Sequence, residues 1–172
     1  QGIAFTDPRL PAMGTRVLLS PDRAHIPVET GDAYDAHRIG LGVPKGGVDF
    51  RYSDAFPYDA DLDKLHGVDF RKGCFIGQEV VSRVEHRGTA RNRVVPVEFE
   101  SAPATGAEVK ADGKVVGTMG SSAGRVGLAM VRVDRVAEAL ASGASLSADG
   151  IAISLRAGFT DMLGKNQNKA AE

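Results

Sequence analysis

Cysteine, tryptophan and long apolar runs are scarce or absent in this sequence. Its 172 residues include one Cys and no Trp. A lone Cys excludes a disulfide within the chain and any zinc or iron–sulfur site built from several of its own Cys residues. The four His residues show no spacing typical of a metal-binding helix, so we expect no metal site. Apolar stretches such as Leu128–Val131 are far too short for a membrane-spanning helix, which needs about 20 residues.

Net charge is also nearly zero. The chain has 21 Lys and Arg residues against 22 Asp and Glu residues, which gives a formal charge of -1. No strong field therefore attracts nucleic acid or an anionic membrane. A content of 42% hydrophobic and 25% charged residues is too rich in core-forming side chains for a disordered chain. The 21 Gly and 8 Pro residues indicate many turns, and hence short strands.

The chain begins at Gln1, without a Met and without a leader segment. We expect it to be a piece of a longer protein whose N-terminal part is missing. A single free Cys fits a reducing compartment. The expected location is therefore the cytoplasm in a bacterium, or the mitochondrial matrix in a eukaryote.

The first half of the sequence predicts short strands, helices and loops. Apolar residues at helical spacing, bounded by capping residues and glycines, indicate two helices. The expected elements are a strand-and-turn region over residues 1–30, a helix capped by Thr30 and ended by Gly40 and Gly42, a loop over 44–60, one helical turn over 61–65, and a helix over 77–87.

Near residue 90 the apolar spacing changes from a helical period to a period of two, which is typical of strands. Asp112-Gly113 lies between two such runs and is a strong hairpin signal. Pro96 suits an edge strand or a bulge. The expected elements are strands over 93–99, 107–110, 114–119, 125–131 and 151–155, with a short helix capped by Asp134 before the last strand.

These patterns together predict an α+β fold with two parts. We expect residues 1–90 to be an α/β part and residues 91–160 to be a small antiparallel β-barrel domain. Residues 161–172 form a polar tail by composition.

Two glycine-rich motifs have ordinary structural interpretations. Gly120–Gly124 has the pattern G-x-S-x-G, but a nucleophile elbow needs a helix after its strand, and here another strand follows. We therefore predict a hairpin turn. Gly40–Gly47 is similar to a phosphate loop, but Pro44 interrupts it and no helix clearly opens after it. We predict a helix end followed by a loop.

A group of basic residues follows the start of the second predicted helix. The more common interpretation is a solvated helix end, where cations also suit the helix dipole. The alternative is a site for a small anionic ligand. Direct nucleic-acid binding is not expected, because Glu79 and Glu85 dilute the positive charge and interleaved aromatic residues are missing. The group comprises Arg83, His86, Arg87, Arg91 and Arg93.

The most informative segment is Lys72–Glu79, with the sequence KGCFIGQE. Cys74 comes just before the second predicted helix. The helix N-terminus and the cations Arg71 and Lys72 favour the thiolate form of Cys74. If residues 72–75 are extended, Lys72 and Cys74 point to one face. A small buried Cys is the alternative, and the residues alone leave both interpretations open.

Other residues of the segment suit a ligand site. Gly73 and Gly77 allow the backbone to approach a ligand closely. Gln78 and Glu79, in the first turn of the expected helix, can hydrogen-bond a polar heterocycle.

At this segment the chain resembles the YgfZ-type folate-binding proteins, which are relatives of the glycine-cleavage T-protein. The family signature usually reads K-G-C-[FY]-x-G-Q-E, followed by an Arg and a basic–Gly pair. Residues Lys72–Glu79, Arg83 and Arg87–Gly88 fit every position of that signature. The resemblance extends back to Arg38–Pro44 and forward to Lys114–Gly117, and it covers most of residues 5–157.

The resemblance implies an accessory protein that supports assembly or repair of iron–sulfur clusters in client enzymes, including radical enzymes that modify tRNA. In this family, α/β and β-barrel parts surround a hole that holds tetrahydrofolate. The implied partners are iron–sulfur client or assembly proteins, folate, and the missing N-terminal part. The motif match implies a reactive pair, Cys74 and Lys72, and folate contacts from Gly73, Phe75, Gly77, Gln78, Glu79, Arg83 and Arg38.

The alternative is a folate-dependent aminomethyltransferase of the T-protein type. T-proteins usually carry Asp at the position of Cys74, and Glu in an R-L-E-A-G-like stretch. The matching stretch here, Arg38–Gly42, contains no carboxylate. Both departures favour the iron–sulfur branch, and we expect an accessory protein rather than an enzyme.

Overall fold

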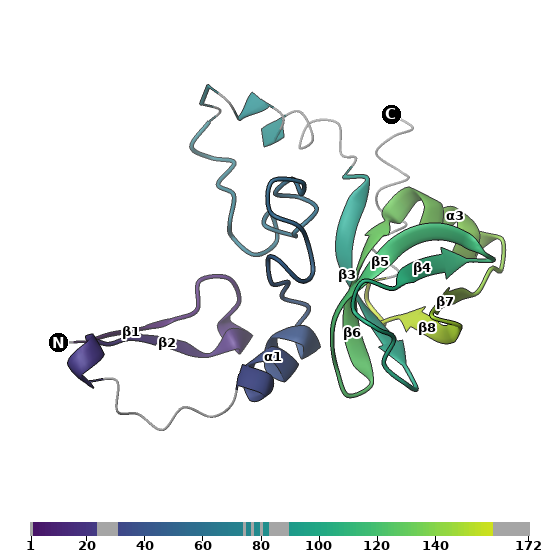
Figure 1. The fold of residues 1–172 in the computed structure, drawn as a ribbon. Coiled ribbons are helices and arrows are strands. Elements are labelled where there is room, and N and C mark those ends of the chain that lie inside the picture. Colours follow the sequence, from purple (N-terminus) through teal and green to yellow (C-terminus); the bar gives the residue numbers. More distant parts are fainter. Residues whose placement is uncertain are drawn as a thin grey trace.

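The computed structural model describes residues 2–23, 31–73, 75–76, 78–79, 81–82 and 90–159. In Figure 1 the C-terminal strands form a barrel on one side of the molecule. A two-stranded ribbon, a helix and a long irregular segment lie on the other side. The expected α+β fold is confirmed, because an antiparallel barrel follows a part that contains both a helix and strands.

The barrel is a closed antiparallel sheet. Its strands follow one another around the barrel in the order β3-β6-β5-β4-β7-β8, and β8 pairs with β3 to close it. Closure leaves no strand edge open to solvent. The strands are β3 (Asn92–Phe99), β4 (Glu108–Ala111), β5 (Lys114–Ala123), β6 (Val126–Arg132), β7 (Leu146–Ala148) and β8 (Ile151–Leu155).

The barrel interior is an apolar core. The predicted alternation in β3 is confirmed, since Val95, Val97 and Phe99 all point into this core. Helix α3 (Val133–Ala141) adds Val136, which is fully buried. The opposite face of β3 is covered as well, because Val94 packs against Ile39 and Leu128 in a second cluster.

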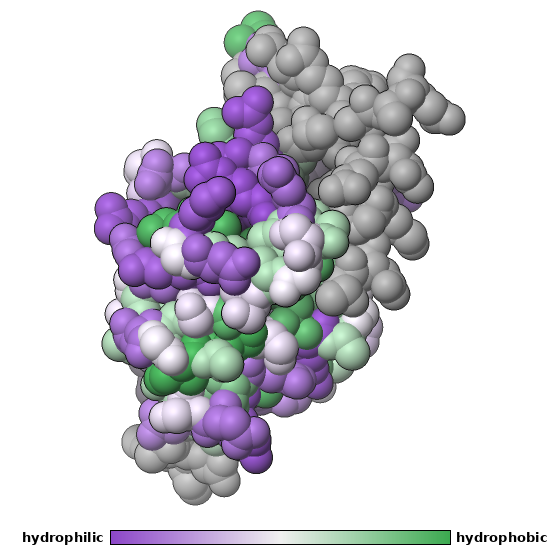
Figure 2. All heavy atoms as spheres, turned by 90° about the vertical axis from the view of Figure 1, so that its right-hand side faces the viewer, coloured by the Kyte–Doolittle hydropathy of each residue, from purple (hydrophilic) through white to green (hydrophobic). Residues whose placement is uncertain are grey.

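The outer face of the barrel is mixed. Figure 2 views the molecule from the barrel side, where hydrophobic atoms lie among hydrophilic ones. Among these strands Val115 is a large hydrophobic residue that remains exposed. The hairpin predicted at Asp112-Gly113 is confirmed, because both residues have positive φ angles (45° and 81°), as a tight type I′ turn requires.

Three details of the barrel differ from the sequence-based expectations. The hairpin turn expected at Gly120–Gly124 is wrong for most of that segment, since β5 continues to Ala123 with a bulge between Met119 and Ser122. Asp134 lies in the first turn of α3, and the N-cap is Arg132. Strand β7 was not predicted, because its three residues are too few to show a period.

Pro96 lies in β3 just before the pairing with β8 begins, so one side of the strand has no strand partner there. Strand β3 pairs with β6 continuously from Asn92 to Glu98, and with β8 only from Val97 to Phe99. The Pro96 carbonyl accepts a hydrogen bond from the Arg156 amide (3.1 Å), so its ring nitrogen faces the same side as β8. The missing N–H therefore falls just before the β8 ladder begins, where its loss disrupts no strand pairing.

The N-terminal part begins with a ribbon and a helix. Strands β1 (Ile3–Thr6) and β2 (Thr15–Leu18) pair with each other, with every residue exposed. The carboxylate of Asp7 holds the turn between them through Arg9 (2.8 Å) and Arg16 (2.7 Å). The hydrogen bond from Arg9, opposed by burial, holds the pKa of Asp7 well below its usual range. Two 3-10 turns lie at Pro11–Met13 and Pro21–Arg23.

Helix α1 (Gly31–Gly40) ends where the glycines predicted, and Gly42 has a φ of 75°. Its expected cap, Thr30, lies outside the described residues. The helical turn expected over residues 61–65 is a turn with one i→i+4 hydrogen bond, from Leu65 N–H to Asp61 C=O (3.0 Å). None of the helices in the described part of the chain has the length and apolar character needed to cross a membrane.

A buried ionic cluster joins α1 to the barrel, and we call it the clasp: Arg38, Asp49 and Ser121. The Arg38 guanidinium donates to Asp49 Oδ2 (2.8 Å) and to Ser121 Oγ (3.0 Å). Ser121 donates from its Oγ (2.6 Å) and its amide (2.7 Å) to Asp49 Oδ1. A side chain at Gly120 would collide with Asp49, so this position requires Gly. The clasp thus fixes α1 and the loop after it on β5.

We expect Arg38→Ala to lower the free energy of unfolding by about 3–5 kcal/mol, because Asp49 would remain buried without its cation. Urea unfolding followed by circular dichroism measures the change. The matched control is Arg132→Ala, which removes an ion pair between more exposed partners and should cost about 0–1 kcal/mol. Equal losses in the two variants would contradict the role of the clasp.

Candidate functional site

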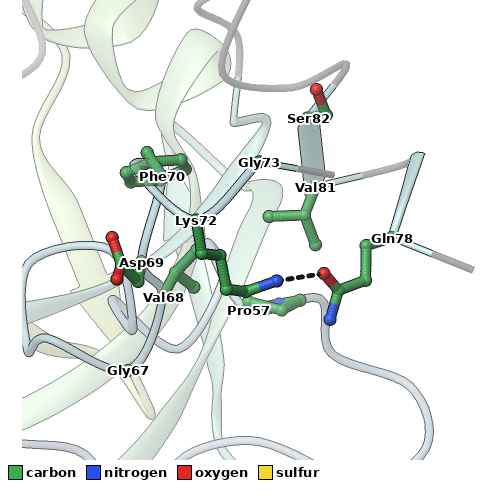
Figure 3. A pocket seen from close by; sticks show the side chains of 10 residues that line it. All are labelled: Pro57, Gly67, Val68, Asp69, Phe70, Lys72, Gly73, Gln78, Val81 and Ser82. Carbon is green, nitrogen blue, oxygen red and sulfur yellow. Dashed lines mark hydrogen bonds between the residues drawn. The ribbon is translucent and has the colours of Figure 1, made fainter. Parts of the chain in front are cut away.

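A cavity of about 500 Å³ lies beside the Lys72–Glu79 segment, and we call it the Lys72 pocket. Figure 3 shows that two stretches of chain form it. One is the irregular segment after α1, and the other is the motif segment itself. The lining residues are Pro57, Gly67, Val68, Asp69, Phe70, Lys72, Gly73, Gln78, Val81 and Ser82.

Lys72 is the polar centre of this pocket. Its side chain extends towards Gln78, and its Nζ donates a hydrogen bond to Gln78 Oε1 (2.6 Å; Figure 3). The same ammonium lies 4.4 Å from the centre of the Phe75 ring, which is within the range of a cation–π contact. These contacts hold one positive charge and one amide at the pocket, where a polar ligand can reach them.

The motif helix is present where residues are described. Glu79, Val81 and Ser82 are helical, and the Ser82 amide donates to the Gln78 carbonyl (3.2 Å). Val81 and Ser82 both line the pocket. Gln78 is described but is not helical, and the other residues of the helix predicted over 77–87 lie outside the described residues.

The structure brings together part of the predicted site. Lys72, Gly73 and Gln78 line the pocket, Phe75 contacts Lys72, and Glu79 is exposed on the adjoining helical turn. Three predicted site residues, Cys74, Gly77 and Arg83, lie outside the described residues.

Two expectations for the predicted site residues differ from what the structure shows. The extended backbone over residues 72–75 is interrupted, because Gly73 has a φ of 82°. This left-handed conformation changes the direction of the backbone after Lys72, and it explains why Gly occupies position 73. Arg38 does not line the Lys72 pocket. Its guanidinium is buried in the clasp, where Asp35 and the Val43 carbonyl also accept from it.

One wall of the pocket was not found from the sequence. It consists of Pro57, which lies in the predicted loop over 44–60, and Gly67–Phe70, for which the sequence predicted no element. The only local signal was an unusual density of aromatic residues between Phe50 and Phe75. Of these residues, Tyr58 is buried, and its ring contacts that of Phe70.

The basic group was also only partly understood from the sequence. Arg93 does not face solvent, since it donates to Asp61 (2.7 Å) and Asp63 (2.6 Å). Burial alone would lower the pKa of Arg93, but the hydrogen bond to Asp63 and the charge of Asp61 raise it. Arg91 is exposed, and Arg83, His86 and Arg87 lie outside the described residues. At Arg93, therefore, the structure supports neither a solvated helix end nor an anion site.

The pocket walls fit tetrahydrofolate in chemical type. Pro57, Val68, Phe70 and Val81 offer apolar surface for a flat ring, while Lys72 and Gln78 offer polar atoms for its edge. The volume lies in the usual range of small-molecule sites, roughly 300–1,000 Å³. In the described part of the chain, no group of three or more His, Cys, Asp or Glu is placed to hold a metal ion.

Comparison with known proteins shows what the chain is similar to. Residues 91–158 match the family model of the CAF17 C-terminal beta-barrel domain. The matched residues include all six strands of the barrel. Human iron-sulfur cluster assembly factor IBA57, mitochondrial, is 35% identical over 169 residues, which are 92% of this chain and 47% of that protein. The mouse protein of the same name is 38% identical over 141 residues, which are 76% of this chain and 39% of that protein.

A fungal relative gives the same result over a shorter region. The Neurospora crassa IBA57 homolog is 38% identical over 117 residues, or 64% of this chain and 26% of that protein. The expected kinship with iron–sulfur assembly proteins is thus confirmed, and the relatives carry the IBA57 name. The chain spans less than half the length of each of these relatives.

A solved structure confirms the expected T-protein-like fold. The glycine cleavage system aminomethyltransferase T from Bartonella henselae superposes with a TM-score of 0.54 over 73% of this chain and 37% of that chain. The two sequences are only 20% identical, so this likeness concerns the fold alone.

Asp59, which lies in the segment that carries the pocket wall, should make the free energy of unfolding depend on pH. Burial raises the pKa of Asp59 above its ordinary value of 3.8, although a hydrogen bond from the Phe56 amide opposes this. The folded chain therefore binds this proton more tightly than the unfolded chain. The contribution of Asp59 to the free energy of unfolding is full below pH 3.8 and is lost as the pH rises through the folded pKa.

We accordingly expect Asp59→Asn to be more stable than the wild type at neutral pH and to lose this advantage near pH 3.8. The amide oxygen of Asn still accepts from Phe56. Urea unfolding at both pH values measures the difference, with Asp112→Asn in the exposed hairpin turn as the control. A difference that does not change with pH would contradict the expectation.

Proposed function

We propose that this chain is the C-terminal part of an iron–sulfur cluster assembly factor that binds tetrahydrofolate at the Lys72 pocket. The observation that carries the proposal is the similarity over 92% of the chain to a protein named as such a factor. The motif segment that predicted this family from the sequence alone also lines the pocket. The chain spans 47% of the length of that relative, so the proposed activity is that of the full-length protein.

In this proposal each residue of the pocket has a role that its geometry supports. The Lys72 ammonium and the Gln78 amide bind polar atoms at the edge of the folate ring. Gly73, with its positive φ, lets the backbone approach the ligand. Phe75 orients Lys72 through the cation–π contact. Glu79 lies one residue beyond Gln78 and adds an acceptor at the helix start. Tetrahydrofolate itself would supply the capacity to carry a one-carbon group.

Other assignments rest on the motif alone. Cys74, two residues after Lys72 in the sequence, acts as a thiolate, Gly77 lets the backbone approach the ligand, and Arg83 binds anionic groups of the ligand. Arg38 has a supporting role through the clasp, because its guanidinium is already bound on several sides. We also propose that the barrel domain begins near residue 91, where the family match begins. The names of the relatives suggest the mitochondrial matrix as the location.

The clients of this factor are proposed to be enzymes that contain [4Fe-4S] clusters, with tRNA-modifying radical enzymes among them. A second candidate function is that of an aminomethyltransferase, because the structural neighbour carries this name. Release of methylenetetrahydrofolate from an aminomethyl donor by the full-length protein would favour that alternative.

The decisive test of the iron–sulfur role is complementation with the full-length protein in cells that lack their own family member. We expect the wild type to restore the activity of a [4Fe-4S] enzyme and Cys74→Ala to fail. Val115→Ala, an exposed barrel position, is the control and should restore activity fully. Equal rescue by wild type and Cys74→Ala would make Cys74 a packing residue, and no rescue by the wild type would reject the proposed function.

Folate binding has a separate test. Isothermal titration of the full-length protein with 5-formyltetrahydrofolate, an air-stable folate, measures the dissociation constant. We expect Lys72→Met to weaken binding about tenfold, which corresponds to loss of about 1.4 kcal/mol. Lys114→Met, in the exposed β4–β5 hairpin, removes the same charge elsewhere and should leave the affinity unchanged. Equal affinities for all three proteins would place the folate elsewhere.

A further inference from the structure

Among the described residues, the barrel makes an ionic contact with the pocket-forming segment through Arg93. Arg93, in β3, donates from NH1 to Asp61 Oδ1 (2.7 Å) and to Asp63 Oδ1 (2.6 Å), and from NH2 to Asp63 Oδ2 (2.9 Å). The side chain of Arg93 is only 12% exposed. A two-pronged Arg–carboxylate contact of this kind fixes the direction as well as the distance of its partner.

Arg93 binds Asp61 and Asp63, which lie on either side of Leu62 in the chain. Leu62 connects two parts of the pocket wall. Its amide donates to the Pro57 carbonyl (2.9 Å), and its carbonyl accepts from the Gly67 amide (2.7 Å). Pro57 and Gly67 both line the Lys72 pocket. Any shift of Asp61 and Asp63 is therefore transmitted through the Leu62 backbone to two lining residues.

A second route reaches the pocket through aromatic rings. The Arg93 guanidinium lies 5.5 Å from the centre of the Tyr58 ring. The Tyr58 ring in turn lies 6.2 Å from the ring of Phe70, which lines the pocket. Tyr58 is buried, whereas Phe70 is partly exposed. Removal of Arg93 would take away one of the contacts of the buried Tyr58 ring.

The segment also has a backbone that needs an external restraint. Asp61 and His66 have φ angles of 55° and 57°, in the left-handed region that non-glycine residues rarely adopt. Each such residue is strained and persists only where its surroundings hold it. The Arg93 contact acts directly on Asp61, one of these two residues.

We propose that Arg93 is the positioning residue of the Lys72 pocket, through which the barrel domain sets the shape of the folate site. It touches no ligand and acts through Asp61, Asp63 and Tyr58. The ligand named here rests on the proposed function, but the restraint on the pocket wall does not.

This chain contains no Trp, so any Trp of the full-length protein lies outside it and is replaced by Phe for a direct test. Phe70→Trp places a single indole on the pocket wall, where its acrylamide quenching reports local order. In this background we expect Arg93→Gln to raise the quenching constant about twofold, because the wall opens locally. Arg93→Lys, which keeps the charge but not the two-pronged geometry, should give partial rescue. The control is Arg125→Gln, which removes an exposed Arg–carboxylate pair of the barrel.

The same variants, without the indole, are titrated with 5-formyltetrahydrofolate in the full-length protein. We expect Arg93→Gln to weaken binding about tenfold while the far-ultraviolet circular dichroism at the assay temperature stays that of the wild type. Asp63→Asn serves as the second variant, and should give a smaller loss because Asp61 still holds Arg93.

The outcomes separate this inference from the proposed function. If the wild type does not bind the folate but Arg93→Gln still raises quenching beyond Arg125→Gln, the positioning role holds and the folate proposal fails. If the wild type binds and Arg93→Gln changes neither affinity nor quenching, the positioning role is overturned. If Arg93→Gln and Arg125→Gln change both readouts equally, the effect is one of general stability and the inference is likewise overturned.

Discussion

The buried pair of Arg38 and Asp49 is the interaction on which the arrangement of the molecule depends. A charge without its partner in an apolar surrounding is far less stable than a paired one, so the pair permits only one placement of α1 on β5. Ser121 completes the cluster by both donating and accepting. The chain between α1 and the barrel, which includes the segment that forms the Lys72 pocket, therefore begins at a position that this ion pair fixes.

The candidate site shows how an irregular segment can serve as a binding wall. It lacks the ladder of hydrogen bonds that a helix or a strand would supply, and it uses charged and aromatic contacts instead. Asp61, Asp63 and Tyr58 are held from the barrel by one guanidinium. The motif segment completes the other wall with Lys72 and Gln78. The pocket therefore belongs to the chain as a whole, although its sequence signature is a short motif.

Much of the fold could be predicted from the sequence because periodic elements follow from local rules. The alternation in β3, the Asp112-Gly113 turn and the glycine end of α1 each depend on neighbouring residues. The family could be predicted because the KGCFIGQE segment is specific. Arg93 was grouped with solvated cations because its partners lie 30 and 32 residues earlier in the chain. The Pro57–Phe70 wall was missed for the same reason, since its order comes from contacts distant in sequence.

The closed barrel has a consequence for the time scales of the molecule. Amides in a sheet without edges are released to solvent only when the sheet itself opens, so their hydrogen exchange follows global unfolding. The turns around Leu62 depend on a few side-chain contacts and can open at a lower free energy. We therefore expect two kinds of opening in this chain: slow unfolding of the barrel strands β3–β8 and faster local opening of the pocket wall. Local opening of the wall would admit or release a ligand while the barrel stays folded.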